Sequence, residues 1–467
     1  MNTEEKKGLN ISAKSFIAAI AIILGLMIAT YVLTFILPGG EYARTVDSNG
    51  NSIIDTVGGF KYVEGGMPLW KWILSPILVL TVEGSGTIIA VIVFLLVIGG
   101  AFNALNECGL MKYMLDKIVN KFGNVKYRLM AVLSFFFMAM GSLVGSFEEV
   151  VPMAPIVVAL AVALGWDKVT GVAMSMLAVG CGFAAGVANP FTVGVAQGLA
   201  GLPMFSGIWM RLLSFVLIYV LLVLFIRAHA KRIEKPISVE HVGADFVRDE
   251  RMEKALKSFA ILLGTGIVLV LSSPFIPFLQ DLTMIIVALM FLVAGLVSVN
   301  QAGMKGKAMG KSFASGIAAI SPSILMILMA SSIKYILVES KILDTMLHGA
   351  VGIAEHMPKF EVILFIYLIC LIMNFFIPSG SAKAFLLIPL IVPIAQIFGI
   401  SPQLCILAYA FGDGFSNVFY PTNPALLITL GLSDVSYGRW AKYSVKFQLM
   451  NLLLTSGVLL LGLAVGY

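Results

Sequence analysis

Long apolar windows without a single charge recur along this chain and constrain its fold more than any other feature. Each is long enough to cross ~30 Å of hydrocarbon as an α-helix. The windows are Phe16–Leu37, Gly84–Asn106, Phe259–Gln280, Leu282–Asn300, Ser312–Ile333 and Phe447–Tyr467. Because 59% of the residues are hydrophobic and only 12% are charged, the chain lacks the charged surface of a water-soluble globule. We therefore predict an all-α polytopic membrane protein; a β-barrel would need alternation, which is missing.

The basic residues gather between the apolar windows. The longest polar segment, 227–257, carries eight basic residues and is expected in the cytoplasm by the positive-inside rule. The same rule explains the net charge of +6 without a nucleic-acid partner. Basic residues at near-helical spacing in Glu107–Arg128 predict an amphipathic helix on the cytoplasmic surface. The sequence leaves open whether Leu69–Val82 spans the membrane or lies at its interface.

The cysteines and histidines of the chain offer no metal site. The four cysteines show no CxxC spacing and lie in or beside apolar segments, so neither a zinc site nor a disulfide framework is expected. The four histidines fall in polar connections, where a solvated side chain is the simpler interpretation. No cofactor or resident metal is predicted.

Two carboxylates interrupt one apolar stretch, where a charge costs roughly 3 kcal/mol at a helix centre unless it is paired or hydrated. The segment Gly141–Glu149 (GSLVGSFEE) ends in Glu148 and Glu149 and separates two apolar arms. It is either a loop between two full helices or the tip of a re-entrant hairpin. The Gly/Ser composition without basic residues favours the hairpin. A similar pattern follows Val362–Phe376, with a tip at IPSGSAK and an arm AFLLIPLIVPIAQIFG.

The second half of the chain repeats the first in inverted orientation. Each half contains an Asn-Pro pair that is predicted to interrupt a helix, because proline removes a helix hydrogen bond. Five markers recur at nearly constant separation: Gly145 and Gly380, Pro152 and Pro389, Pro155 and Pro393, Gly165 and Gly399, and Asn189-Pro190 and Asn423-Pro424. Inverted repeats with broken helices indicate a secondary transporter whose substrate binds near the midplane of the membrane.

The chain resembles the YfcC-like branch of the anaerobic C4-dicarboxylate carrier (DcuC) family, within the ion transporter superfamily. The resemblance covers essentially the whole chain and rests on four blocks in order. These are GSFEEVVPMAPIVVALAVALGWDKVTGVAM, ANPFTVGVAQGLAG, NFFIPSGSAKAFLLIPL, and FGDGFSNVFYPTNPALLITLGL followed by YGRWAKY. The acidic pair Glu148–Glu149 is typical of this branch. Lys383 departs from the pattern, which has a neutral residue at the second tip, and this puts a sodium site there in doubt.

The resemblance implies a dimeric carrier of the bacterial inner membrane that works by an elevator movement of a transport domain against a scaffold. The transport domain is expected to hold both hairpins and both broken helices, in residues 126–205 and 360–433. The scaffold then comprises residues 1–125 with the first amphipathic arm, 206–359 with the linker 227–257 and the second amphipathic arm, and the last helix in 434–467. The expected partners are a small-molecule substrate, membrane lipid and a second copy of the chain.

In that superfamily the tips and the broken helix centres hold the substrate and the coupling ions. The corresponding candidate substrate-binding residues are Ser146, Glu148, Glu149, Asn189, Pro190, Thr192, Ser379, Gly380, Ser381, Lys383, Asp413, Ser416, Asn417, Thr422 and Asn423. A coupling sodium ion or proton stays open, with a cation site near Ser146, Glu149 and Asn189. Lys383 is expected to meet a substrate carboxylate, to replace a coupling cation, or to neutralise a glutamate; Asp413 is expected at the unwound centre of its helix.

The charge balance of this site favours a cationic substrate. Three acids (Glu148, Glu149 and Asp413) stand against one base (Lys383), so a basic amino acid would neutralise the site and a dicarboxylate would not. We therefore predict exchange or import of basic amino acids of the arginine/ornithine type. The alternative is a sodium- or proton-coupled symporter of dicarboxylates or other small carboxylates, in which the adjacent glutamates share a proton because like charges raise one another's pKa. An aspartyl protease would need two buried aspartates, so the chain is not expected to be an enzyme.

Overall fold

Helices dominate the computed structural model, which describes residues 13–46, 52–54, 59–82, 85–143, 145, 147, 150–203, 205–235, 248–272, 276, 283–354 and 357–467. Within these ranges six helices are long and apolar enough to cross a membrane: Leu110–Leu143, Lys168–Ala185, Ile208–Ile233, Lys359–Phe376, Gly380–Ile397 and Tyr437–Val465. The prediction of a helical, multi-pass membrane protein is confirmed.

One group of helices, here called the first group, comes mostly from the N-terminal part and the middle of the chain. Its members are α1 (Ala13–Ile36), α2 (Leu69–Leu78), α3 (Ser85–Glu107), α11 (Glu250–Ser272), α13 (Thr283–Gln301), α14 (Gly306–Ile320) and α15 (Pro322–Glu339). Helix α3 packs against α13 and α14, and α15 packs against α1 and α2. With its 10 residues α2 is about 15 Å long, too short to cross the hydrocarbon core.

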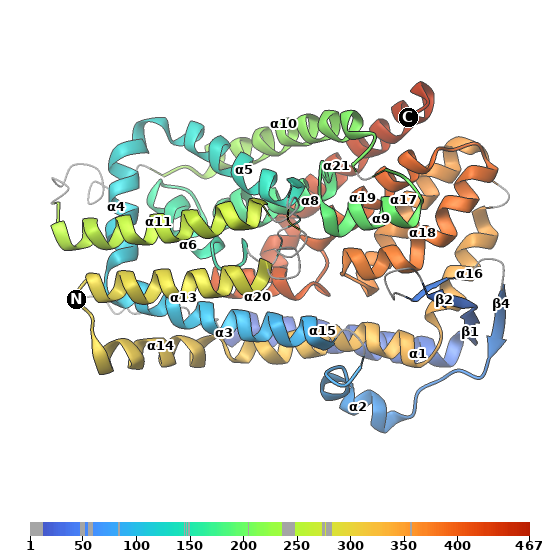
Figure 1. Cartoon of the computed structure of the whole chain (residues 1–467), viewed down its shortest axis with the longest axis horizontal. Coiled ribbons are helices and arrows are strands. Elements are labelled where there is room, and N and C mark those ends of the chain that lie inside the picture. The colour runs from blue at the N-terminus through green and yellow to red at the C-terminus, as the bar shows by residue number, and fades with distance from the viewer. Residues whose placement is uncertain are drawn as a thin grey trace.

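A second group holds both tips and both breaks. It comprises α5 (Lys126–Leu143), α6 (Ala154–Ala163), α7 (Lys168–Val172), η3 (Ala173–Leu177), α8 (Ala178–Ala185), η4 (Pro190–Gly194), α9 (Val195–Leu199), α10 (Ile208–Ile233), α17 (Lys359–Phe376), α18 (Gly380–Ile397), α19 (Pro402–Asn417), α20 (Pro424–Leu432) and α21 (Tyr437–Val465). Helix α8 packs on α5, α10 and α19, and α19 packs on α17, α18 and α21. Figure 1 shows α5, α8 and α10 on one side of the molecule and α3, α14 and α15 on the other.

Two shorter helices lie beside these groups. Helix α4 (Leu110–Phe122) follows α3 and leads through the turn η1 (Gly123–Val125) into α5, and it occupies the segment predicted as a basic amphipathic helix. Helix α16 (Leu343–Ala354) packs against α17 and α18. The window Ser312–Ile333, predicted as one span, is divided at Ser321, because Pro322 cannot continue the helix hydrogen bonding and starts α15 instead.

The helical runs are interrupted at both predicted breaks. The continuous run Lys168–Ala185 ends where Gly186 takes a left-handed conformation with φ 50°, and η4 begins at Pro190. Helix α19 ends at Asn417, and α20 begins at Pro424. After the first tip, α6 has only 10 residues, or about 15 Å, which favours a re-entrant arm over a full crossing.

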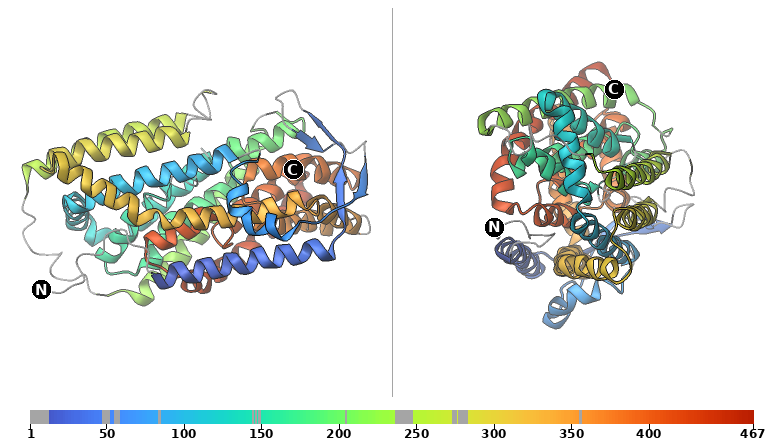
Figure 2. Two further views of the ribbon diagram at one scale, coloured as in Figure 1. Left: turned by 90° about the horizontal axis from the view of Figure 1, so that it is seen from below. Right: turned by 90° about the vertical axis from the view of Figure 1, so that its left-hand side faces the viewer.

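Two short β-ribbons lie between Gly39 and Val63, so the predicted all-α description is incomplete. Strand β1 (Gly39–Tyr42) pairs antiparallel with β4 (Phe60–Val63), and β2 (Arg44–Val46) pairs with β3 (Ser52–Ile54). Asp344 of α16 fixes them, since it accepts hydrogen bonds from Tyr42 N at 3.0 Å and from Arg44 Nη2 at 2.9 Å. Figure 2 shows the strands at one end of the molecule.

Glycines let three helices of the second group approach backbone to backbone. A Cβ atom on Gly182 of α8 would collide with the Met138 carbonyl oxygen of α5, and one on Gly141 of α5 would collide with the Val179 carbonyl oxygen. A Cβ atom on Gly414 of α19 would collide with the backbone of Ala184. Small residues at such crossings allow the close van der Waals packing on which helix association in membranes depends.

Gly182→Ala is expected to lower the apparent melting temperature of the purified protein. The added methyl group meets a backbone oxygen that cannot rotate away, and overpacking of this kind costs about 1–3 kcal/mol. Gly457→Ala is the matched control, because beyond the adjacent residues and backbone of its own helix no described atom lies within 4 Å of its Cβ position. Equal melting temperatures for the two variants would contradict the close crossing of α5 and α8.

Candidate substrate-binding site

The start of α18, the C-terminal part of α19 and the turn η4 that follows the first break meet at one point. Gly380 is the first residue of α18, and a Cβ atom placed on it would lie 2.6 Å from Asp413 Oδ2 and 2.6 Å from Thr192 Cγ2. Asp413 belongs to α19, and Thr192 belongs to η4. The three positions predicted at the second tip and at both breaks therefore adjoin one another.

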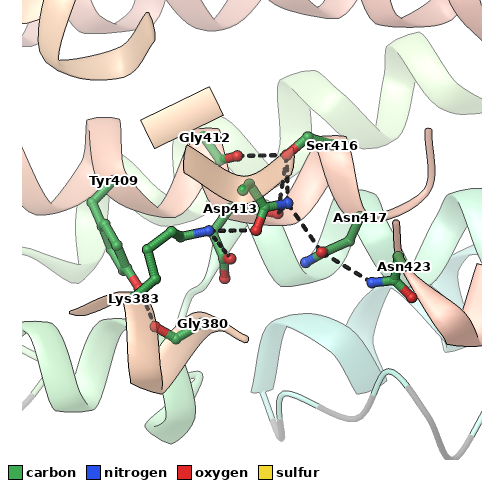
Figure 3. A network of polar contacts seen from close by, with 9 residues as sticks. Gly380, Lys383, Tyr409, Gly412, Asp413, Ser416, Asn417 and Asn423 are labelled. Atoms are coloured by element: carbon green, nitrogen blue, oxygen red, sulfur yellow. Dashed lines mark hydrogen bonds and ion pairs between the residues drawn. The ribbon is translucent and has the colours of Figure 1, made fainter. Parts of the chain in front are cut away.

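Lys383 and Asp413 form a buried ion pair at this point. Lys383 Nζ donates to Asp413 Oδ1 at 2.5 Å and also to Asn374 Oδ1, and both charged side chains are 0% exposed (Figure 3). The ammonium also lies 5.8 Å from the ring centroid of Tyr409, whose hydroxyl donates to the Gly380 carbonyl oxygen. Among the described residues the acidic partner of Lys383 is Asp413, because α19 brings it against the first turn of α18. The glutamates that the sequence offers as partners of Lys383 lie outside the described residues, so that alternative stays a prediction.

The amide of Asn374 joins this ion pair to a chain of polar side chains. Asn374 Nδ2 lies 2.7 Å from Ser416 Oγ and 3.0 Å from Asn417 Oδ1, and Asn423 Nδ2 donates to Asn417 Oδ1 at 3.0 Å. Figure 3 shows Ser416, Asn417 and Asn423 following one another along this chain. Sequence reasoning missed Asn374, although an asparagine near the end of an otherwise apolar helix was a usable signal.

Asp413 lies inside α19, four residues before its end, and not in the unwound segment where the sequence places it. The helix α19 continues to Asn417, and within it the Ser416 hydroxyl donates to the Gly412 carbonyl oxygen at 2.7 Å. The Asp413 Oδ1 atom accepts the hydrogen bond from Lys383. The break itself starts after Asn417.

The two Asn-Pro asparagines cap the helices that follow the breaks. Asn189 Oδ1 accepts hydrogen bonds from the backbone N–H groups of Phe191 at 2.9 Å and Thr192 at 3.2 Å. Asn423 Oδ1 accepts one from Leu426 N at 3.3 Å. Gly145 of the first tip lies against Asn189 and has φ +77°, so a side chain there would meet the Asn189 amide. Both asparagine oxygens are thus used by the protein itself.

Several buried polar atoms at this site have no hydrogen-bond partner. Among the described residues they are Asn189 Nδ2, Thr192 Oγ1, Asp413 Oδ2 and Thr422 Oγ1, and all four belong to predicted site residues. A buried polar atom without a partner carries the full cost of its desolvation. Unpaired atoms of this kind, gathered on residues of the predicted site, are expected where a ligand completes the hydrogen bonding.

The remaining predicted residues are placed as follows. Ser379 precedes α18 and is exposed, and Ser381 in its first turn is half-buried. Ser146, Glu148 and Glu149 lie outside the described residues, so of the predicted cation site only Asn189 is described. In the part of the chain that the structure describes, no three His, Cys, Asp or Glu side chains come together in a way that would hold a metal ion.

Comparisons with known proteins place the chain among carriers. The family model for the C4-dicarboxylate anaerobic carriers matches residues 16–465. YfcC of Escherichia coli (strain K12), named as a proposed basic amino acid antiporter, is 29% identical over 405 residues, or 82% of this chain and 79% of that protein. An uncharacterized protein of Haemophilus influenzae is 27% identical over 391 residues, or 81% of this chain and 76% of that protein.

Two solved transporter structures are also similar. YdaH of Alcanivorax borkumensis is 21% identical, with a TM-score of 0.45 over 97% of this chain and 99% of that one. MtrF of Neisseria gonorrhoeae, described with a class of antimetabolite efflux pumps, is 15% identical, with a TM-score of 0.45 over 94% of each chain. At this TM-score we infer neither fold nor activity from them. Because the family model spans nearly the whole chain, the protein belongs to the C4-dicarboxylate anaerobic carrier family and is a multi-pass membrane transporter, not an enzyme.

Proposed function

We propose that this carrier exchanges basic amino acids of the arginine/ornithine type across the bacterial inner membrane. The observation that carries the proposal is the buried ion pair of Lys383 and Asp413, which leaves the second tip neutral. The charges that remain for the substrate at the candidate site are those of Glu148 and Glu149 on the first tip, whose sequence neighbours Phe147 and Val150 are buried. A single cationic side chain offsets one of these two negative charges, whereas a dicarboxylate adds two more.

The family description alone would favour a dicarboxylate. A dianion entering this site, however, would find the one lysine among the described site residues already engaged by Asp413. Burying further negative charge without a partner is strongly unfavourable. The name of YfcC, a proposed basic amino acid antiporter, points in the same direction as the charge balance.

We further propose an elevator movement in a homodimer, with α10 and α21 moving together with the hairpins. The sequence assigns these two helices to the scaffold, but α10 packs on α5 and α8, and α21 packs on α17 and α19. Asp167, before α7, accepts a hydrogen bond from Arg439 Nη2 of α21 at 3.0 Å and lies 3.4 Å from His229 Nε2 of α10. Burial opposes ionisation of Asp167, but hydrogen bonds from His229 and Thr170 outweigh it and hold the pKa of its carboxyl well below the usual range.

Exchange in this proposal needs no sodium ion at the second tip. The ammonium of Lys383 already binds the carboxylate oxygen of Asp413 and the amide oxygen of Asn374, which are the oxygen ligands that a hard cation would use. A proton or sodium ion at the first tip, near Ser146, Glu149 and Asn189, stays compatible with the proposal. In an exchange without a coupling ion, the concentration gradients of the exchanged amino acids drive transport.

The test is counterflow into proteoliposomes that contain the full-length protein. Liposomes loaded with unlabelled arginine or ornithine are expected to accumulate labelled arginine transiently and saturably in sodium-free buffer. Liposomes without internal amino acid are expected to take up little. Uptake of labelled succinate that arginine does not inhibit, and that requires sodium or a proton gradient, would instead support the carboxylate symporter.

A further inference from the structure

We infer that the Lys383–Asp413 pair is the receptor for the α-amino-acid head group, whose carboxylate binds Lys383 and the start of α18 and whose ammonium binds Asp413 Oδ2 and Thr192 Oγ1. The inference rests on the proposed function and assigns the two ends of the substrate to the two tips. The head group binds at the second tip, and the basic side chain extends to the first tip with its glutamates.

The carboxylate side of this receptor is the first turn of α18. The N–H groups at the start of a helix have no acceptor within the helix, and the positive end of the helix dipole lies there. Ser379 stands at the N-cap position, yet among the described contacts its side chain caps no N–H group. The first intrahelical bond runs from Lys383 N to the Ser379 carbonyl oxygen at 3.0 Å, so the Lys383 ammonium and these N–H groups belong to the same turn. A carboxylate suits this combination of charge and donors.

The ammonium side is built from two unpaired oxygens. Asp413 Oδ2 and Thr192 Oγ1 are buried atoms without a partner among the described residues, and both side chains are 0% exposed. Asp413 Oδ2 and Thr192 Cγ2 would both lie 2.6 Å from a Cβ atom on Gly380, so the two side chains approach the first residue of α18 together. Only a glycine lets the two side chains come this close to the first residue of α18. An ammonium with three donors can serve both oxygens at once.

A zwitterion fits here for an electrostatic reason. The carboxylate and the ammonium of an α-amino acid are attached to one carbon atom. They are therefore held close together, as are the ammonium of Lys383 and the carboxylate of Asp413. Inserting the zwitterion between these two side chains leaves the net charge of the buried site unchanged. An amine without the carboxylate would leave Lys383 without an anion once Asp413 turned to the ligand, and an uncompensated buried charge is strongly unfavourable.

The direction of the substrate side chain follows from the same contacts. Thr192 is three residues beyond Asn189 at the first break, and Asn189 lies against Gly145 of the first tip. The line from Gly380 through Thr192 and Asn189 to Gly145 therefore leads from the second tip to the first. A basic side chain placed along this line points toward Gly145, which precedes Glu148 by three residues in the sequence.

The experiment measures inhibition of labelled-arginine exchange in proteoliposomes by three compounds: arginine, agmatine, which lacks the α-carboxylate, and Nα-acetylarginine, which lacks the α-ammonium. Wild-type protein is expected to bind agmatine and Nα-acetylarginine roughly 10- to 100-fold more weakly than arginine, the effect of one lost charged hydrogen-bond partner. Thr192→Val, which removes a hydroxyl without a partner and is expected to fold, should weaken arginine about tenfold and leave Nα-acetylarginine unchanged.

Lys383→Met should weaken the binding of arginine, which loses the partner of its carboxylate, and strengthen the binding of agmatine, which no longer leaves a buried lysine unpaired, so that the two compounds bind alike. Lys442→Met, at an exposed position of α21, is the matched control and should keep the wild-type order. Agmatine that inhibits wild-type exchange as well as arginine would overturn the head-group receptor while leaving the proposed exchange of cations standing. Wild-type protein that exchanges no basic amino acid at all would overturn the proposed function, and the receptor with it.

Discussion

Asp413→Asn is expected to abolish arginine exchange and to destabilise the protein. The substitution leaves the ammonium of Lys383 buried at 0% exposure without its carboxylate. Removing one partner of a buried ion pair costs about 3–5 kcal/mol, because the other charge stays uncompensated. The measurements are counterflow of labelled arginine and the apparent melting temperature in detergent.

A second substitution separates stability from transport. Lys383→Met in the Asp413→Asn background removes the unpaired charge and should recover most of the melting temperature, since neutral side chains often replace a buried pair at little cost. Exchange should stay absent, because the head group has lost both of its charged partners. If the double variant transported arginine at the wild-type rate, the pair would be structural only.

The surface of the protein offers a matched control for this cycle. Lys168 and Asp434 form an ion pair at 2.8 Å in which both side chains are more than 40% exposed. Exposed pairs contribute about 0–1 kcal/mol. Lys168→Met and Asp434→Asn, alone and together, should therefore leave both melting temperature and exchange close to wild type.

Glu148→Gln and Glu149→Gln are expected to produce the second large effect, a loss of cation recognition in a protein that still folds. Each change removes one negative charge from the first tip and keeps the shape of the side chain. Truncating one partner of a desolvated charge pair typically costs about 2–5 kcal/mol. In the variant that lacks the carboxylate in contact with the substrate, the KM for arginine should therefore rise about 30-fold or more. Because each change removes a charge from an apolar stretch and keeps the size of the side chain, the melting temperature should not fall.

The control for this experiment is Glu64→Gln, because Glu64 is exposed in the segment that follows β4. It should leave the KM for arginine unchanged. If both tip variants also kept the wild-type KM, the net charge of the first tip would not select the substrate, and the argument for a cationic amino acid would lose its main support. A gain of succinate transport in the tip variants would show that these charges exclude anions.

Much of the architecture follows from local patterns in the sequence. Charge-free windows predict helices in a membrane, and a proline that follows an asparagine predicts a break, because both depend on residues that are near one another in the chain. The structure has its breaks at Asn189-Pro190 and Asn423-Pro424 for this reason. Local signals also predict the two tips, because glycine and serine between two apolar segments are typical of a turn that joins two helices.

The candidate site was only partly predictable from the sequence. The residue types were identified, but the partner of Lys383 was not, because Asp413 lies 30 residues further along the chain on another helix. The role of Asn374 was missed for the same reason. The β-ribbons near Tyr42 depend on Asp344, which is 302 residues away in the chain. Contacts between residues that are far apart in the sequence cannot be predicted from a local pattern.

The sequence by itself determined that this protein is a helical membrane carrier with charged residues at interrupted helices. Only the tertiary structure decided that Lys383 pairs with Asp413. Glycines such as Gly182 and Gly414 bring α5, α8 and α19 into backbone contact. The packing of α18 on α19 then sets Lys383 against Asp413, because a buried ammonium is stable only where a carboxylate lies within hydrogen-bonding distance.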